Sequence, residues 1–169
     1  MSFNSINYLI FLPLVCMGYF AIPKKGRNIY LLAVSYYFYW CNEARFFLLL
    51  PFLTAATFFA GKAIDKAEGK SRKAYFLAGI GLNLGILVFF KYNRFFLNTI
   101  MDITGAQIDL SWWLLPMGIS FFVFMAVSYL ADIMLNKYHA EENFVKFAVY
   151  ITFFPHILMG PIDRANKFL

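Results

Sequence analysis

The feature that most constrains this sequence is a series of long apolar runs without charged residues. They lie at residues 2–23, 28–42, 46–61, 74–90, 110–131 and 147–162. A helix that crosses the hydrocarbon core of a bilayer needs about 20 apolar residues, with a range of roughly 17–25. The first and fifth runs meet this length, and the fourth is at its lower limit. The other three fall short unless flanking side chains reach out to the interface.

The runs are continuous rather than alternating, which predicts helices rather than strands. Lipid supplies no hydrogen-bond partner to the backbone, so only helices and closed barrels span a bilayer. We therefore expect an all-α fold, a polytopic transmembrane helical bundle with about six membrane segments, some of them short or broken. The run at residues 28–42 is the best candidate for a short or re-entrant helix. No repeat or linker divides the chain, so residues 1–169 are predicted to form a single membrane domain.

Composition excludes several other classes of protein. Hydrophobic residues make up 62% of the chain and charged residues 14%, against roughly 45–50% and about 25% in soluble domains. The net charge is +6, but the basic residues fall in short clusters between the runs. This pattern favours contact with anionic lipid and argues against a nucleic-acid partner, which needs a continuous basic face. Cys16 and Cys41 are embedded in apolar sequence, so we expect two small buried residues rather than a disulfide or zinc site.

The basic clusters also predict an orientation. If the N-terminus is outside, most lysines and arginines fall in the inner segments, as the positive-inside rule requires. We therefore expect a multi-pass protein of the cytoplasmic (inner) membrane. Its N-terminus is predicted outside, and the loop from Lys62 to Lys73 in the cytoplasm. The N-terminal run has no basic stretch before it and no cleavage site, which favours a retained first span over a signal peptide.

Residues 91–111 do not resemble a span. The segment carries Lys91, Arg94 and two aspartates, with apolar residues at helical spacing. We expect a helix that lies in the membrane interface with its polar side toward water.

Charged residues at depth in a membrane are costly, so each is a functional candidate. Asp132 closes the fifth run. It either positions a substrate or side chain within the bundle, or lies at the cytoplasmic end and pairs with Lys137. His139 lies in a polar loop and is expected to be solvent-exposed.

The last run contains His156 between two prolines, Pro155 and Pro161, with Gly160 beside the second. Each proline removes a backbone donor, so this segment is predicted to be bent, and bent helices in membranes line cavities. His156 as a general base is the alternative, but no carboxylate or nucleophile stands at a useful spacing. The sequence has no metal-ligand spacing and no phosphate-binding loop, so no metal site is predicted.

Several segments, taken in order, resemble the membrane-bound O-acyltransferase family, in particular its alginate O-acetyltransferase-like branch. The resemblance begins at residues 1–5 and 11–14 and continues through 35–40, 82–85 and 90–92. It is strongest in Leu-Pro-Met-Gly-Ile-Ser-Phe-Phe-Val-Phe at residues 115–124, followed by Tyr129 and Asp132. The proline-glycine segment at residues 153–162 completes it.

This resemblance implies transfer of an acyl group, commonly acetyl, to hydroxyls of a polysaccharide such as alginate outside the cytoplasmic membrane. It also implies a cytoplasmic donor (acetyl-CoA or another acyl carrier), no bound cofactor, and partner proteins of an exopolysaccharide acetylation system. The family's catalytic histidine is expected beyond Leu169, so the chain corresponds to an N-terminal portion. The substrate-channel walls implied by the resemblance are Pro116, Gly118, Ser120 and Phe121 together with Pro155, His156, Gly160 and Pro161, with Asp132 and Arg164 as polar support.

Two other functions stay open from the residues themselves. A small transporter is expected to carry charged groups near the middle of the bilayer and an inverted repeat, and neither is visible. A non-catalytic membrane scaffold that recruits partners is also compatible with the sequence.

Overall fold

The computed structural model describes residues 6–104, 116 and 118–155, and the regular structure in these ranges is helical. This confirms the all-α prediction for the described part of the chain. Two short 3₁₀ turns, η1 (Lys24–Gly26) and η2 (Ala44–Phe46), connect consecutive helices. The described α-helices are α1 (Ile6–Ala21), α2 (Arg27–Glu43), α3 (Leu49–Lys66), α4 (Gly69–Thr104), α5 (Ile119–Met134) and α6 (Phe144–Thr152).

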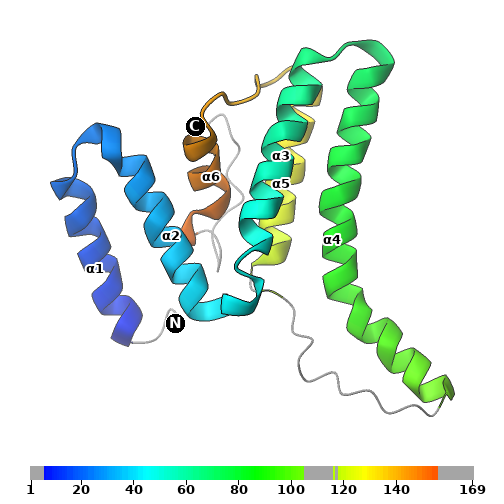
Figure 1. Ribbon diagram of the computed structural model, residues 1–169, viewed down its shortest axis with the longest axis horizontal. Coiled ribbons are helices and arrows are strands. Elements are labelled where there is room, and N and C mark those ends of the chain that lie inside the picture. Colours follow the sequence, from blue (N-terminus) through cyan, green and yellow to red (C-terminus); the bar gives the residue numbers. More distant parts are fainter. Residues whose placement is uncertain (1–5, 105–115, 117, 156–169) are drawn as a thin grey trace.

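Successive helices run in opposite directions along the bundle (Figure 1). α1 and α2 form one hairpin, and α3 and α4 form a second. α5 packs against both α3 and α4, while α6 contacts α2, α3 and α5. α6 therefore joins the two hairpins, and α1 is attached mainly through α2.

The core is built largely from aromatic rings. Tyr129 of α5 and Phe147 of α6 have ring centroids 4.7 Å apart, and Phe58 of α3 lies 5.6 Å from Phe147. Just after the end of α6, Phe154 packs on Phe38 of α2, with ring centroids 5.6 Å apart. All five side chains are buried. Ring pairs at such distances contribute about 0.5–1.5 kcal/mol beyond the area that they bury.

The outer surface of the bundle is apolar as well. Phe20 is 74% exposed and Leu48 is 77% exposed, and many other large apolar side chains share this surface. Soluble monomers rarely expose apolar patches of this extent. Two helical stretches, Ala44–Lys66 and Gly69–Asn93, are long and apolar enough to cross a membrane, whereas Tyr8–Ala21 and Ile119–Met134 are apolar but shorter. The number of about six membrane segments therefore stays a prediction.

The two cysteines correct the sequence-based expectation. Cys16 of α1 and Cys41 of α2 are both exposed, not buried. The prediction failed because an apolar neighbourhood in the sequence has two meanings in a membrane protein: it marks residues that face other helices and residues that face lipid.

Residues 91–104 are helical, as expected, but they do not form a separate element. They continue α4, which runs unbroken from Gly69 to Thr104 and bends toward its C-terminal end (Figure 1). Phe95, Phe96 and Ile103 are exposed on this last part. Its location in the membrane interface stays a prediction, and residues 105–111 lie outside the described ranges.

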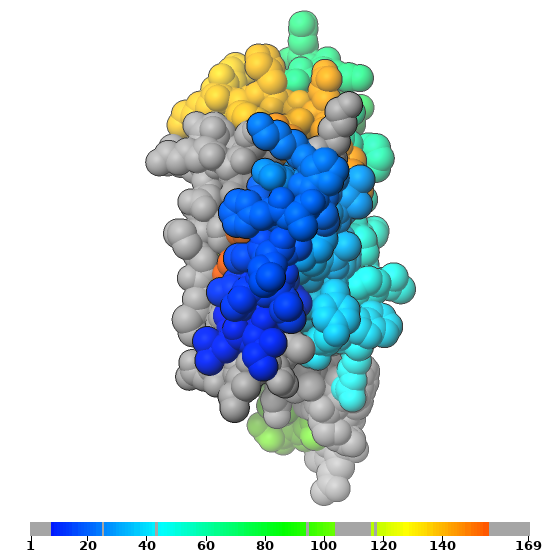
Figure 2. Space-filling view, turned by 90° about the vertical axis from the view of Figure 1, so that its left-hand side faces the viewer, coloured from blue at the N-terminus to red at the C-terminus, as the bar shows by residue number. Residues whose placement is uncertain are grey.

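Most lysines of the connections lie at one end of the bundle. η1, the α3–α4 turn and the α5–α6 loop all lie at one end, at the top of Figure 1, whereas η2 lies at the other. Lys24, Lys66, Lys70 and Lys137 are therefore gathered at one end. Figure 2 looks onto α1 and α2, with the α5–α6 loop above them. The alternating helices thus bring together the three basic segments that the orientation argument placed on one side.

Candidate functional site

The start of α5 holds the first group of predicted channel-wall residues. Gly118 is the residue before the helix and has φ 74° and ψ 0°, the left-handed conformation that glycine adopts most easily. The carbonyl oxygen of the buried Pro116 accepts a hydrogen bond from the Ile119 amide at 3.3 Å. Ser120 and Phe121 are half-buried in the first turn. The proline and glycine therefore make a tight turn that starts α5 abruptly.

The end of α6 carries the predicted break. α6 stops at Thr152, and Phe153 is extended with φ −56° and ψ 114°. Pro155 lacks an amide hydrogen and its ring crowds the carbonyl four residues earlier, so α6 does not continue through it; the chain breaks at Phe153 and is helical again at Phe154 and Pro155. The amide of Phe154, freed from the helix, donates to the hydroxyl oxygen of Ser35 on α2 at 3.3 Å. His156, Gly160, Pro161 and Arg164 lie outside the described residues, and their roles stay predictions.

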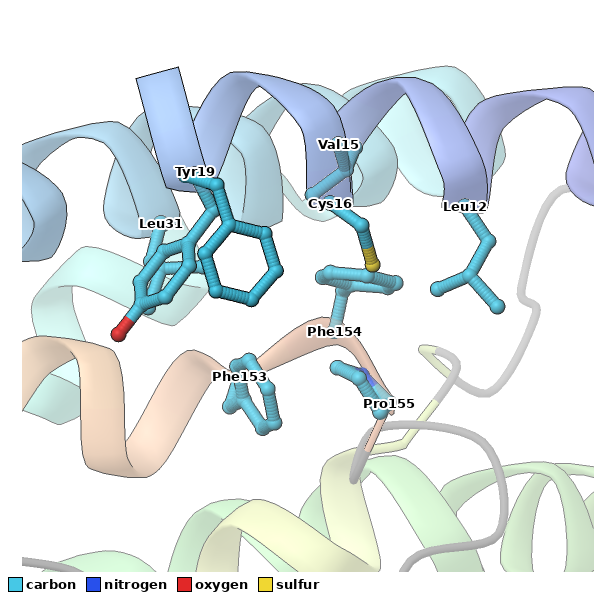
Figure 3. Close-up of a pocket in the computed structure, with 9 residues that line it drawn as sticks. Leu12, Val15, Cys16, Tyr19, Leu31, Phe153, Phe154 and Pro155 are labelled. Atoms are coloured by element: carbon cyan, nitrogen blue, oxygen red, sulfur yellow. The ribbon is translucent and has the colours of Figure 1, made fainter. Parts of the chain in front are cut away.

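An apolar cleft of about 310 Å³ opens beside this break. In Figure 3, α1 lies on one side of it and the segment after α6 on the other. Pro155 is among its lining residues, as a channel-wall role requires, but the four predicted residues at the start of α5 are not. The cleft is lined by Leu12, Val15, Cys16, Tyr19 and Phe20 of α1, Leu31 of α2, and Phe153, Phe154 and Pro155.

Asp132 is half-buried near the end of α5. Of the two alternatives for Asp132, pairing with Lys137 is not among the ion pairs of the described residues; the two residues are joined through the backbone, where the Lys137 amide donates to the Asp132 carbonyl at 2.9 Å. The Asn136 amide donates to the Ile133 carbonyl at 3.0 Å, and Asn136 is left-handed with φ 55°. These bonds form a Schellman cap, which ends the helix and leaves Lys137 exposed.

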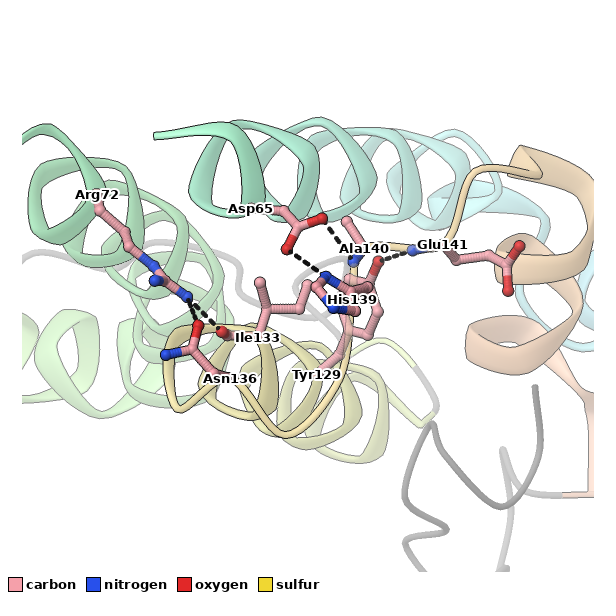
Figure 4. A network of polar contacts seen from close by, with 8 residues as sticks. All are labelled: Asp65, Arg72, Tyr129, Ile133, Asn136, His139, Ala140 and Glu141. Carbon is pink, nitrogen blue, oxygen red and sulfur yellow. Dashed lines mark hydrogen bonds and ion pairs between the residues drawn. The ribbon is translucent and has the colours of Figure 1, made fainter. Parts of the chain in front are cut away.

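The same cap is bound by an arginine from α4. One terminal nitrogen of Arg72 donates to the Ile133 carbonyl at 2.8 Å and to the side-chain oxygen of Asn136 at 2.5 Å (Figure 4). The carbonyls at the end of a helix carry partial negative charge, which a guanidinium stabilises. Arg72 thus ties the beginning of α4 to the end of α5.

A second polar contact holds the α5–α6 loop to α3. The carboxylate of Asp65 accepts from the Ala140 amide at 3.3 Å and lies 3.3 Å from Nδ1 of His139 (Figure 4). The His139 side chain is 97% exposed, which confirms the prediction that it faces solvent. A pair this exposed contributes little to stability.

Glu141 is the centre of a third set of contacts in this loop. Its amide donates to the hydroxyl of Tyr129 at 3.0 Å, and its carboxylate lies 3.3 Å from the Lys146 ammonium. Tyr138 donates to the same carboxylate at 3.4 Å. Burial, followed by the negative charge of Glu141, raises the pKa of the Tyr138 phenol above its usual value.

Sequence reasoning also missed a polar pair inside the bundle. Thr57 of α3 and Asn83 of α4 are both buried, and the Asn83 amide group lies 3.2 Å from the Thr57 hydroxyl oxygen. The same amide group donates to the Gly79 carbonyl at 2.9 Å. The signal was present, since each residue is an uncharged polar residue within an apolar run, and such side chains commonly bond across membrane helices.

These contacts hold helices together, and they do not form a reaction centre. Within residues 6–104, 116 and 118–155, no group of three or more His, Cys, Asp or Glu residues could hold a metal ion. Asp65 and Arg72 were missed because their partners are set by the fold, whereas the carboxylate of Glu141 binds residues near it in the sequence. Asp65 and Ala140, for example, are 75 residues apart in the sequence.

Comparison with known proteins gives a consistent set of relatives. A probable alginate O-acetylase of Pseudomonas putida is 34% identical over 171 residues, which cover 97% of this chain and 35% of the relative. The corresponding protein of Pseudomonas aeruginosa is also 34% identical, with 97% and 33% covered. A peptidoglycan O-acetyltransferase of Helicobacter pylori is 25% identical, with 99% and 38% covered. No family model and no solved structure matches the chain.

The chain thus spans about a third of the length of the curated relatives that it matches. The matches cover the tight turn before α5 as well as the break after α6, because they extend over nearly all 169 residues. Together with the apolar helices, they identify a membrane protein. The chain is similar to the N-terminal part of alginate O-acetylase-like proteins, as its resemblance to the membrane-bound O-acyltransferase family predicts.

Proposed function

We propose that this protein takes part in O-acetylation of a surface or secreted polysaccharide at the cytoplasmic membrane, with alginate as its acceptor. The observation that carries the proposal is the 34% identity to probable alginate O-acetylases along 97% of the chain. Peptidoglycan, the acceptor in the name of a more distant relative, is the second acceptor to test. The donor is acetyl-CoA or another acyl carrier, delivered from the cytoplasm.

In this proposal the described helices build the frame of the active site. The tight turn at Gly118 and the break at Pro155 shape two inner walls, with Asp132 as polar support. The general base that deprotonates the acceptor hydroxyl is a histidine beyond Leu169, and partner proteins of the acetylation system complete the pathway to the polysaccharide.

Acetyl content of the polysaccharide tests the function. Ester-linked acetate is released by mild base from alginate and from peptidoglycan of a deletion strain and of the same strain with the gene restored. We expect acetate to be lost from alginate and to return on complementation. Unchanged acetate on alginate with a loss on peptidoglycan would identify peptidoglycan as the acceptor in place of alginate. Unchanged acetate on both polymers would reject the proposal.

The identity of the base can be tested in the same strain. Complementation with His156→Ala is expected to keep acetate clearly above the level of the deletion strain, because the base is assigned to another histidine and His156 only to the channel wall. Acetate as low as in the deletion strain, with the variant protein present in the membrane at wild-type abundance, would contradict this assignment.

A further inference from the structure

We propose that the cleft between α1 and the end of α6 binds one acyl chain of an anionic phospholipid, whose phosphate is held by the basic turn at η1. The proposal goes beyond acetyl transfer and rests on insertion of the bundle in a membrane. Its premises are the shape of the cleft, its lining and the charges at one of its ends.

The cleft has the form of an acyl-chain site. Leu12, Cys16 and Phe20 stand at successive four-residue spacings along α1, so they line one stripe of that helix. Eight residues of helix correspond to about 12 Å, close to the roughly 15 Å depth of one leaflet of the hydrocarbon core. Phe153 and Phe154 form the opposite side (Figure 3). The side chains from both sides are apolar or weakly polar, which suits a hydrocarbon chain.

The walls of the cleft are fixed before any lipid arrives. The Tyr30 hydroxyl on α2 donates to the Val15 carbonyl of α1 at 3.2 Å. The tyrosine reaches that carbonyl through the space beside Gly18, where an added Cβ would lie 2.7 Å from the ring carbon Cζ of Tyr30. On the other side, Ser35 holds the Phe154 amide. Both sides are therefore anchored to α2.

The upper end of the cleft meets a concentration of positive charge. The Arg27 guanidinium lies 4.8 Å from the centre of the Tyr19 ring, which lines the cleft, and its Nε donates to the Ile22 carbonyl at 3.2 Å. Arg27 stands four residues before Leu31 on α2, so it continues the lined face. Lys24 is exposed on the same turn. α2 begins here with no side-chain cap and no acidic residue in its first turn.

The charge of the headgroup determines which lipid the cleft prefers. Lipid tails are as apolar as the cleft, so a chain gains little by moving from the bilayer into it. Preference must come from the headgroup, and this end offers Lys24, Arg27 and the uncapped start of α2 to a phosphate. An anionic diacyl lipid meets both requirements, because its chain enters at the same depth at which its phosphate meets the basic turn.

Native mass spectrometry of the purified full chain in mild detergent tests the proposal. The protein is mixed with equal amounts of phosphatidylglycerol and phosphatidylcholine that carry the same acyl chains. We expect the wild type to retain phosphatidylglycerol preferentially. Lys24→Gln and Arg27→Gln are each expected to lower this preference about fivefold, because the attraction of one basic residue to an anionic surface corresponds to about this factor in affinity. Arg45→Gln, at the opposite end of the bundle, is the matched control and is expected to leave it unchanged.

The cleft itself is tested with a second matched pair. Cys16→Trp fills the cleft and is expected to reduce retention of both lipids. Cys41→Trp places the same side chain on an exposed surface of α2, away from the cleft, and is expected to have no effect. Equal retention of the two lipids by the wild type would overturn the proposal. So would equal effects of Lys24→Gln and Arg45→Gln, or of the two tryptophan variants.

Discussion

At the scale of single residues, the bundle depends on positions where helices approach closely. Gly61 of α3 is buried against α5, where an added Cβ would lie 2.8 Å from Cε1 of Tyr129 and 3.1 Å from Cδ1 of Ile133. Both neighbours are themselves fully buried and cannot move aside cheaply. Gly81 is also a glycine in a membrane-length helix, α4, but no neighbouring atom lies within 4 Å of the position of an added Cβ.

This contrast gives a prediction about stability. Overpacking in Gly61→Ala is expected to lower the free energy of unfolding by about 1–3 kcal/mol. The better helix propensity of alanine offsets up to about 1 kcal/mol of this loss. Gly81→Ala carries only the second effect and is expected to stabilise the protein. Unfolding of both variants in mild detergent measures the difference. Equal stabilisation by the two substitutions would contradict the close approach at Gly61.

At the scale of elements, the helices are joined by side chains that bind the ends and middles of their neighbours. Thr57 and Asn83 link α3 to α4 within the bundle, and Ser35 links α2 to the break after α6. Arg72 links α4 to the end of α5, where it binds a carbonyl 61 residues away. Thr57, Asn83 and Ser35 satisfy polar groups inside the bundle that lipid cannot hydrate.

The Arg72 contact predicts local opening when it is removed. Arg72→Gln is expected to weaken the cap of α5 by roughly 1–2 kcal/mol, since charged hydrogen bonds to helix ends contribute about this much. The result is faster amide hydrogen exchange at residues 133–137. Lys73→Gln removes a neighbouring exposed charge and serves as the control, with exchange expected to stay at the wild-type rate. If both variants exchanged at the same rate, the cap would not depend on Arg72.

At the scale of the whole molecule, the alternating helices gather at one end of the bundle the three connections that carry Lys24, Lys66, Lys70 and Lys137 (Figure 1). Positively charged connections remain on the cytoplasmic side when membrane helices insert. The fold and the positive-inside rule therefore agree on which connections share a side. We predict that this end is cytoplasmic.

Labelling of single cysteines tests this orientation. In a background with Cys16→Ala and Cys41→Ala, Lys66→Cys is expected to resist a membrane-impermeant maleimide in intact cells and to react after the cells are opened. Arg45→Cys, at the other end, is expected to react in intact cells. The reverse pattern would invert the orientation, and labelling of both positions in intact cells would contradict a bundle that crosses the membrane between them.

The predictions that succeeded from sequence rest on local rules. The break after α6 follows from the missing amide hydrogen and the ring of Pro155, and exposure of His139 follows from its polar loop. The extent of α4 was predicted less well, because Lys91 and Arg94 were taken to end a segment that in fact continues to Thr104. A helix backbone satisfies its own hydrogen bonds whether it is in lipid or at the interface, so charge alone does not end it.

By itself, the sequence determined the class of the fold, the helical runs and the family. These depend on composition, on prolines and on the order of segments. Only the tertiary structure decided which apolar residues meet other helices and which face outward, as Cys16 and Cys41 show. It also decided the partners of Asp65, Arg72 and Asn83. The physical reason is that lipid and a protein core are both apolar, so hydrophobicity marks the membrane but not the packing face.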